Sequence, residues 1–389
     1  MLSRVRTPRT LLVLSTIALV ACSSSSSSSP APSSDSGALV DSASDTIVDA
    51  PIDAPVDAPA APYSRTIFDA ARIGSDSSKP NFQKVEADVQ LDRGPYAEVK
   101  LVLDLSSTCF PFSNWATDKP PSGQNWPADC DAFDRNYETH LIDPAAGKDA
   151  LPLELVRAIT PFGGPLHIEQ DVTDVFNFID GGKRTVRVVI PSYSDGAGKV
   201  SGSNGGWKVS AHLEVTPGDA PHRVLSVVSL ANGNVGAKDV PADLPFTLPA
   251  GTTSSRIEYR VTGHGGADGG TTSCIGPAEE FCRRQHHVTI DGAKLDDFTP
   301  WRNDCRKLCT IQHESTIGNF DYCAENPCGA VSSVRAPRAN WCPGSLTPPF
   351  SWTPDALKSP GKHAFKYAID GVVDGGTWRV SATLFAYGD

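Results

Sequence analysis

Short runs that alternate apolar and polar residues recur from residue 63 to the end of the chain. They are rich in Val, Ile, Thr and aromatic residues and are separated by Gly, Pro, Asn and Asp, which is typical of antiparallel strands. The runs are YAEVKLVLDLS, TVRVVIPSY, WKVSAHLEV, RVLSVVSLA, SRIEYRVTG, HHVTIDG, FKYAIDGV and WRVSATLFAYG. Helical periodicity is scarce, since DALPLELVRAI also fits a loop followed by a strand. We therefore predict an all-β fold of two sandwiches or jelly rolls.

The chain has 389 residues, which is enough for about two domains. The segment TPGDAPH, residues 216–222, is a Pro- and Gly-rich turn cluster between two predicted strands. We place the domain boundary there. The predicted N-terminal domain covers residues 63–218, and the predicted C-terminal domain covers residues 219–389.

The N-terminus has the pattern of a bacterial lipoprotein signal. Residues 1–21 combine a basic start with the short apolar run LLVLSTIALV, and Leu19 to Cys22 resemble a lipobox. We expect cleavage before Cys22, acylation of that cysteine and attachment to the outer membrane or cell surface. The alternative is a plain secretory signal followed by a chance cysteine.

Residues 22–62 contain a serine run and a DAPx repeat, and we expect them to form a disordered tether. The formal net charge of the whole chain is −11 at pH 7. An acidic chain with no basic tract argues against a nucleic-acid partner.

Nine of the ten cysteines lie beyond Cys22. In an exported chain they are expected to form disulfides. Because nine is odd, at least one thiol must stay free or pair outside the chain.

The stretch PAEEFCRRQHHVTIDG, Pro277 to Gly292, concentrates acids and histidines. If it is extended from Glu280 onward, His286 and His287 point to opposite faces and do not share one ion. The chain has no His-Glu-x-x-His motif and no CxxC pair, so we expect no metal site. A Cys274–Cys282 disulfide would fix the loop that carries Glu280, which suits acid–base chemistry. The alternative is a solvated glutamate.

A second acidic cluster lies in CDAFDRNYETHLI, which begins at Cys130. It contains Asp131 and Asp134, and Arg135 follows directly. An arginine beside Asp134 favours the ionised carboxylate and therefore a base or electrostatic role. The alternative is a structural ion pair at the start of a strand.

Five motifs in colinear order resemble the peptide:N-glycosidase F family. CDAFDR resembles the family's Cys-Asp-x-aromatic-Asp-Arg signature, and AEEFCRRQHHVTIDG resembles its Glu-aromatic-Cys-x-Arg-x-His strand. The other matching motifs are RAITPF (157–162), DVTDV (171–175) and RANWCPG (338–344). Together they cover about residues 64–389.

The resemblance implies two antiparallel jelly rolls side by side, with the active site in the cleft between them. It also implies hydrolysis of the amide that joins asparagine to the innermost N-acetylglucosamine of an N-linked glycan. The expected partners are N-linked glycoproteins or glycopeptides, and no cofactor is required. We expect a monomer.

Position by position, Asp134 corresponds to the family's primary catalytic aspartate, and Glu280 to its second essential carboxylate. Arg135 and Arg338 correspond to arginines expected to bind the carbonyl or the sugar hydroxyls. Two further cleft positions, where the family has tryptophans, are Phe281 and His264.

One departure concerns the family's third acidic cleft residue, which helps to bind the chitobiose core. Pro191 or Ser192 stands at that position here. Tyr193 and Trp301 are candidates to compensate by stacking on sugar rings, and the alternative for each is ordinary core packing.

Three disulfides would hold the segments that carry the expected site residues. We expect Cys109–Cys130 beside Asp134, Cys274–Cys282 beside Glu280 and Cys305–Cys342 beside Arg338. Of the remaining cysteines, we expect a Cys323–Cys328 bond that leaves Cys309 free.

Two rival functions share the expected architecture. A copper-dependent twin jelly-roll monooxygenase would need a methionine ligand, and Met1, in the signal peptide, is the chain's single methionine. A non-catalytic surface glycan-binding protein would retain the fold and lose the acids, whereas Asp134 and Glu280 are both present.

Overall fold

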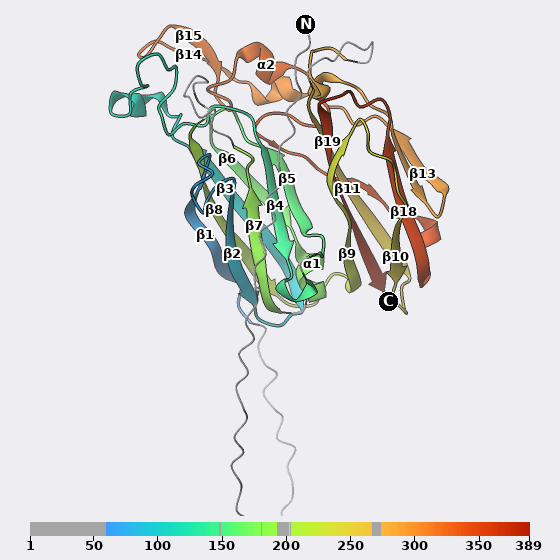
Figure 1. The fold of residues 1–389 in the computed structure, drawn as a ribbon. Helices are drawn as coiled ribbons and strands as arrows, with labels where there is room; N and C mark the ends of the chain where they lie inside the picture. Colours follow the sequence, from blue (N-terminus) through green and yellow to red (C-terminus); the bar gives the residue numbers. More distant parts are fainter. Residues whose placement is uncertain (1–59, 148, 180, 193–201, 203, 267–273) are drawn as a thin grey trace, which may run out of the picture. The chain divides into compact units, whose positions relative to one another are not determined.

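The computed structural model describes residues 60–147, 149–179, 181–192, 202, 204–266 and 274–389. Within them the regular secondary structure is mostly antiparallel β-sheet, arranged as two β-sandwiches (Figure 1). The predicted all-β fold class is confirmed. The predicted signal peptide, Cys22, Tyr193 and nearly all of the predicted tether lie outside the described residues.

The first sandwich consists of a four-stranded and a five-stranded sheet. The four-stranded sheet is β1 (Tyr63–Gly74), β8 (Gly206–Pro217), β3 (Tyr96–Ser107) and β6 (Leu166–Asp171) in spatial order. The five-stranded sheet is β16 (Ser345–Leu346), β5 (Leu153–Ile159), β4 (Asn136–Ile142), β7 (Gly182–Val189) and β2 (Lys84–Leu91). Apolar side chains from both sheets form one core, which includes Ile73, Leu101, Tyr137, Val188 and Trp207.

The second sandwich consists of two four-stranded sheets. One sheet is β17 (Phe350–Trp352), β11 (Ser254–Gly265), β19 (Gly376–Gly388) and β9 (Arg223–Gly236). The other is β10 (Leu244–Leu248), β18 (Gly361–Ile369), β12 (His286–Ile290) and β13 (Ala293–Phe298). Their shared core includes Tyr259, Val288, Phe365, Trp378 and Leu384.

The remaining described elements are short. The hairpin β14 (Ile311–Glu314) and β15 (Phe320–Cys323) lies at the same end of the molecule as α2 (Val331–Arg335), and α1 (Thr173–Ile179) lies at the opposite end (Figure 1). Single 3₁₀ turns occur at Phe112–Ala116, Pro144–Ala146, Glu279–Phe281, Cys305–Leu308 and Asp355–Leu357. In the described part of the chain, no helix combines the length and the apolar character that crossing a membrane requires.

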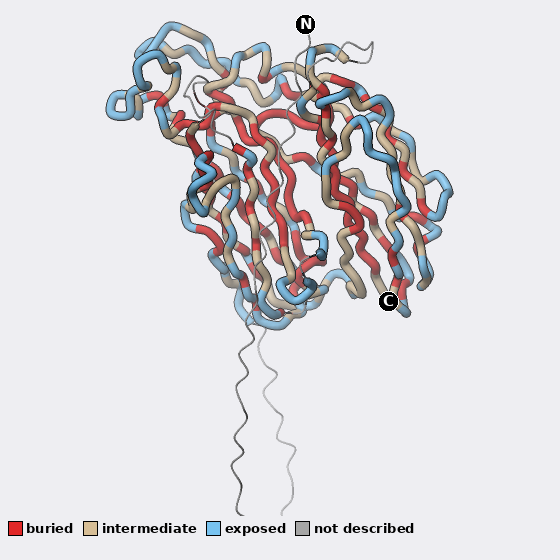
Figure 2. The backbone as a smooth tube through the Cα atoms, viewed as in Figure 1, coloured by how far each residue is buried: buried red, intermediate tan, exposed pale blue. Residues whose placement is uncertain are grey.

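The inner sheets of the two sandwiches pack against each other, which explains two strands that are buried on both faces (Figure 2). Every residue of β19 from Val380 to Ala386 is buried. Along this strand Leu384 belongs to the second core, whereas Phe385 belongs to the first. Strand β5 is likewise buried from Glu154 to Ile159.

Charged groups cross this interface in paired form. Arg379 of β19 donates from Nε and Nη2 to the two carboxylate oxygens of Glu138 in β4, at 2.7 and 2.8 Å. Arg157 of β5 pairs with Glu154 at 2.6 Å and also donates to the backbone carbonyl of Arg260 in β11 at 3.3 Å. Buried charges are tolerated when they are paired and hydrogen-bonded, so these contacts hold the two sandwiches in a fixed register.

The described residues from 60 to 389 form one compact unit. The predicted boundary between residues 218 and 219 lies in the connection between β8 and β9 and stays a prediction. The two sandwiches are not built strictly from the two halves of the chain. Strand β16 comes late in the sequence, yet it pairs with β5 of the first sandwich.

Replacing Arg157 with Met should lower the free energy of unfolding by about 3–5 kcal/mol, because the substitution leaves the buried Glu154 carboxylate without its partner. Thermal and urea unfolding of wild type and variant would measure this. The matched control is Lys358→Met, which breaks an exposed pair with Asp355 and should change stability by less than about 0.5 kcal/mol. Equal effects of the two substitutions would contradict a structural role for the buried pair.

Candidate active site

Three residues predicted as site residues come together from separate segments. Asp134 precedes β4, Glu280 lies in the 3₁₀ turn Glu279–Phe281, and Arg338 follows α2. Arg338 Nη1 donates to Glu280 Oε1 at 2.6 Å, and Arg338 Nη2 lies 3.7 Å from Asp134 Oδ2. The arginine side chain is 1% exposed, against 17% for Asp134 and 24% for Glu280. Both carboxyl groups therefore reach solvent, while the cation lies behind them.

The turn that carries Glu280 differs from the extended segment expected from the sequence. Strand β12 begins only at His286, and the preceding 3₁₀ turn directs two consecutive glutamates to different environments. Glu279 is fully buried and accepts hydrogen bonds from Arg284 Nε at 2.6 Å and from Trp378 Nε1 at 2.8 Å. Because Glu279 anchors the turn in the second sandwich, the neighbouring Glu280 faces Arg338.

The two histidines of this segment have different environments, as the alternation predicted. His286 is fully buried, and its Nδ1 lies 3.1 Å from the hydroxyl of Tyr259. Burial lowers the pKa of His286 to about 3, so its ring is neutral at pH 7. His287 lies on the outer face between Asp297 and Asp370. Neither histidine contacts Arg338 through a hydrogen bond.

Arg135 has a different partner from the one expected. Its Nε lies 3.1 Å from Asp131 Oδ2, and its guanidinium stacks over the ring of Phe133 at 4.9 Å. Asp131 is fully buried. The structural ion pair considered for this cluster is thus formed by Arg135 and Asp131, whereas Asp134 is approached by Arg338 at 3.7 Å.

Burial, rather than a neighbouring arginine, dominates the ionisation of Asp134. Loss of solvent raises the pKa of Asp134 to about 7, opposed by the charge of Arg338 and reinforced by Glu280. Arg135 does favour the ionised form, as expected, but its attraction is smaller than that of Arg338, and burial outweighs both. Burial also raises the pKa of Glu280, against the lowering effect of Arg338. A carboxyl whose pKa lies near 7 exchanges protons readily at neutral pH.

Aromatic rings enclose the Arg338 guanidinium. It lies over the ring of Phe281 at 4.9 Å and over the ring of Trp341 at 4.5 Å. His264 stacks on Trp341 with a ring separation of 5.4 Å, and burial lowers the pKa of His264 to about 3. Phe281 and His264 were predicted to bind substrate. In the structure Phe281 packs on Arg338 directly, and His264 reaches it through Trp341.

Trp301 packs against the core of the second sandwich, and the guanidinium of Arg283 lies 4.9 Å above its ring. The structure thus gives Trp301 a packing role. Its predicted stacking on a sugar ring stays a prediction.

The three disulfides expected beside the site residues are present: Cys109–Cys130, Cys274–Cys282 and Cys305–Cys342. Each lies within a few residues of one of the three site residues, and it limits how far that segment can move.

The fourth disulfide corrects the remaining expectation. It joins Cys309 to Cys323 and leaves Cys328 as a free thiol. Strands β14 and β15 form a hairpin in which Ile311 pairs with Cys323, so the residues just before Ile311 lie beside Cys323. After a turn at Asn326 the chain leaves the hairpin, and the backbone of Cys328 bonds to Phe162 instead. A short sequence separation was therefore a poor guide to this pairing.

Sequence reasoning missed two residues of this cluster, Ser333 and Trp341. Trp341 lies inside the RANWCPG motif, so its position could have been noticed. Ser333 belongs to no motif; both its carbonyl oxygen and its Oγ accept from Arg338 Nη2 at 3.0 Å.

Two other clusters in the described residues bring metal-binding atom types within 4.8 Å of one another. One consists of Cys328 and the Cys109–Cys130 disulfide. The other consists of Glu138, His140 and Glu154, whose carboxylates already pair with Arg379 and Arg157. Two guanidinium groups at the second cluster would repel an added cation.

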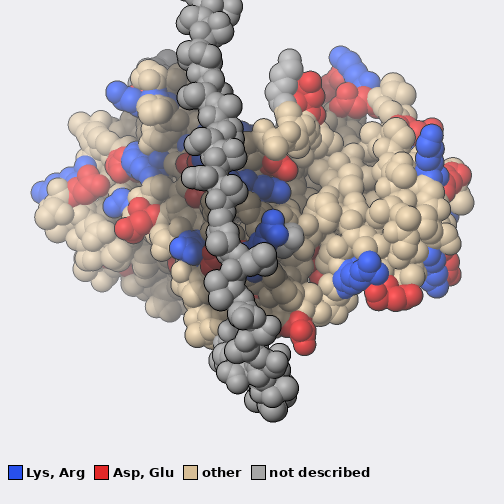
Figure 3. Space-filling model, turned by 90° about the horizontal axis from the view of Figure 1, so that it is seen from below, with Lys and Arg blue, Asp and Glu red and all other residues tan. Residues whose placement is uncertain are grey.

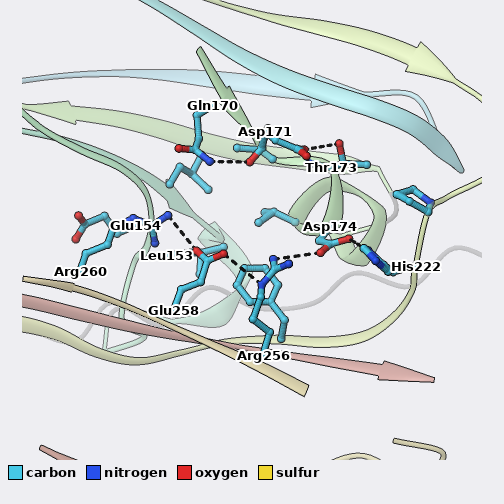
Figure 4. A pocket seen from close by; sticks show the side chains of 15 residues that line it. Leu153, Glu154, Gln170, Asp171, Thr173, Asp174, His222, Arg256, Glu258 and Arg260 are labelled. Carbon is cyan, nitrogen blue, oxygen red and sulfur yellow. Dashed lines mark hydrogen bonds and ion pairs between the residues drawn. The ribbon is translucent and has the colours of Figure 1, made fainter. Parts of the chain in front are cut away.

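A polar cavity of about 210 Å³ lies near α1, at the opposite end of the molecule from α2. Its charged groups neutralise one another: Asp174 contacts His222 and Arg256, and Glu258 contacts Arg256 and Arg260 (Figure 4). On the face seen from below, basic and acidic side chains are interspersed as well (Figure 3). The carboxylates of Asp174 and Glu258 in this cavity are therefore each paired with a cationic side chain.

Comparison with known proteins gives one family model, described as peptide-N-glycosidase F, C terminal, which matches residues 234–385. No curated protein matches this sequence. Among solved structures, PNGase F, a glycosylasparaginase from Flavobacterium meningosepticum, aligns with a TM-score of 0.61 at 16% identity, covering 84% of this chain and 96% of that one. PNGF-II aligns with a TM-score of 0.60 at 20% identity and the same coverage of this chain.

The chain spans 65% of the length of PNGF-II. At these identities the structural likeness establishes the shared fold of two side-by-side β-sandwiches. The matching segment of the family model lies in the second sandwich, which carries Glu280 and Arg338. Together, these comparisons show that residues 234–385 match the C-terminal part of peptide-N-glycosidase F and that the chain shares the fold of the solved peptide-N-glycosidase structures.

Proposed function

We propose that this protein hydrolyses the amide bond between asparagine and the innermost N-acetylglucosamine of N-linked glycans on glycoproteins or glycopeptides. The observation that carries the proposal is the cluster of Asp134, Glu280 and Arg338, in which two partly exposed carboxyls flank a buried guanidinium. The solved structure described as a glycosylasparaginase shares the fold, which supports the same class of reaction.

Amide hydrolysis needs an activated water, stabilisation of the oxyanion and a proton for the leaving amine. In the proposed mechanism, ionised Asp134 accepts a proton from water as the water oxygen attacks the asparagine side-chain carbonyl carbon. The resulting carboxylic acid then donates that proton to the departing nitrogen as the carbon–nitrogen bond breaks. The products are an aspartate-containing peptide and a glycosylamine.

Glu280 and Arg338 have supporting roles in this proposal. Glu280 accepts from Arg338 at 2.6 Å and keeps a second carboxylate oxygen for water or a sugar hydroxyl. Arg338 provides positive charge near the carbonyl oxygen that becomes negative in the transition state. Arg338 is nearly fully buried and lies behind the two carboxyls. Its effect on the reaction is therefore electrostatic and does not involve direct contact with the substrate.

The reaction is tested by incubating the protein with an N-glycopeptide in ¹⁸O-labelled water. The expected result is an aspartate that carries one labelled oxygen, together with release of the whole glycan. Glycan release that leaves one N-acetylglucosamine on the peptide would instead identify an endoglycosidase. Binding of the glycopeptide without turnover would favour the glycan-binding alternative.

Replacing Asp134 with Asn should reduce turnover by about 100-fold or more, because the amide retains the shape of the side chain and cannot accept the proton from water. The ¹⁸O assay measures this, with thermal unfolding as the control for an intact fold. Near-normal turnover in Asp134→Asn would rule out this residue as the base.

Replacing Glu280 with Gln should reduce turnover by about tenfold or more, because the neutral amide loses its ion pair with Arg338. The matched control is Glu279→Gln, where the same change affects the buried anchor beneath the turn. We expect Glu279→Gln to lower the thermal midpoint more than Glu280→Gln does, because Glu279 is fully buried whereas Glu280 is partly exposed and Arg338 keeps Asp134 nearby. An unchanged rate in Glu280→Gln would make this residue an ordinary solvated glutamate.

Turnover should rise with pH through about 7, since the base must be ionised and the pKa of Asp134 is about 7. Below that value kcat/KM should fall about tenfold per pH unit, as the ionised fraction does. Initial rates between pH 5 and 9 on one glycopeptide would measure this acidic limb. A limb centred near pH 4, the ordinary value for aspartate, would contradict the proposed environment of Asp134.

A further inference from the structure

Ser333, in the middle of α2, contacts the buried guanidinium from the side that also faces Asp134. Its backbone carbonyl and its Oγ both lie 3.0 Å from Arg338 Nη2. The same nitrogen lies 3.7 Å from Asp134 Oδ2, which is beyond hydrogen-bonding distance. Arg338 Nη2 therefore donates to the two neutral oxygens of Ser333 at close range, while the carboxylate of Asp134 lies farther from the same nitrogen.

The other groups around Arg338 leave its guanidinium little freedom to move. The rings of Phe281 and Trp341 lie against it, at 4.9 and 4.5 Å, and restrict motion out of its plane. Its backbone pairs with Arg302 in both directions. Among the described residues, no hydrogen-bond partner contacts the buried Arg338 Nε. The position of the Arg338 guanidinium within its own plane is therefore set by hydrogen bonds at its two Nη groups. Glu280 accepts from Nη1, and Ser333 accepts from Nη2.

We infer that Ser333 is a positioning residue whose oxygens hold Arg338 short of a full ion pair with Asp134. Without the Ser333 hydroxyl, Nη2 loses one of its two close acceptors. The nearby charged acceptor is Asp134, so the guanidinium would shift toward it. A bond from the guanidinium to a carboxylate adds the attraction between opposite charges, which a neutral hydroxyl acceptor does not provide, and this makes the shift favourable.

The charges around Asp134 indicate what this shift would do. Arg338 is the largest electrostatic influence that favours the ionised form, Glu280 opposes it, and Arg135 contributes less while it pairs with Asp131. Interactions in a water-poor site depend strongly on distance. Closing the gap to Arg338 would therefore lower the pKa of Asp134 below its present value of about 7.

A carboxylate held in a full ion pair is a weaker base. Ser333 thus preserves the proton affinity that the proposed amide hydrolysis requires, and this consequence for the rate rests on the proposed function. The consequence for the ionisation of Asp134 does not, because it can be measured without any substrate.

The decisive variant is Ser333→Ala, compared with Ser333→Thr, which retains the hydroxyl. Alanine has the highest helix propensity, so the Ala variant should retain α2. The Asp134 carboxyl is followed by ¹³C NMR titration of the full chain, and Asp134→Asn identifies its signal. We expect Ser333→Ala to lower the pKa of Asp134 by about 0.5 or more, and Ser333→Thr to match wild type.

A double-mutant cycle tests whether Ser333 acts through Arg338. Replacing Arg338 with Met removes the cation. In that background Ser333→Ala should leave the Asp134 titration unchanged. An equal shift with and without the arginine would overturn the inference, as would an Asp134 titration in Ser333→Ala that is identical to wild type.

Kinetics then separate this inference from the proposed function. If the protein is an amidase, the acidic limb of the pH profile in Ser333→Ala should move to lower pH by the same amount as the NMR titration, and kcat should fall more than KM changes. An absence of turnover in wild type would reject the proposed function, while the NMR comparison would still decide the role of Ser333.

Discussion

The organisation of this protein depends on a buried guanidinium that two carboxyls share. Arg338 is almost inaccessible to water, so its charge must be balanced by acids that approach it closely. One of these acids, Asp134, belongs to the first sandwich, and the other, Glu280, belongs to the second. The pair therefore exists only when the two sandwiches are correctly aligned, and this requirement explains much of the surrounding structure.

Alignment is provided by an interface that contains buried charged residues. The inner sheets meet through the ion pair of Arg379 with Glu138, and through Arg157, which pairs with Glu154 of its own strand and donates to the backbone carbonyl of Arg260. Strand β16 adds a strand from the second half of the chain to the first sandwich. Ion pairs that are buried and paired in this way contribute little net stability, but they penalise misalignment, since a shift would leave charges unpartnered. The interface thus favours one relative position of the sandwiches.

A similar pairing of charges is found beside each acid of the candidate site. Asp131 and Asp134 are three residues apart, and Glu279 and Glu280 are adjacent. In both cases one acid is fully buried and paired with its own arginine, and the other is left to face Arg338. The buried acid anchors the loop, while the partly exposed acid carries the proposed chemistry. Partial burial of the second acid then raises its pKa, because solvent is lost without a full compensating ion pair.

The sequence by itself determined the all-β fold, because alternating apolar residues must bury one face of each strand, and this pattern is local. It also determined which residues are candidates for the site, since the motifs that carry Asp134, Glu280 and Arg338 are contiguous. Only the tertiary structure decided which charges meet. Arg135 neighbours Asp134 in the sequence, yet it pairs with Asp131, and the Cys309–Cys323 disulfide follows from a hairpin register. Such pairings depend on the packing of distant segments and on the cost of burying charge, neither of which is a property of any short stretch of chain.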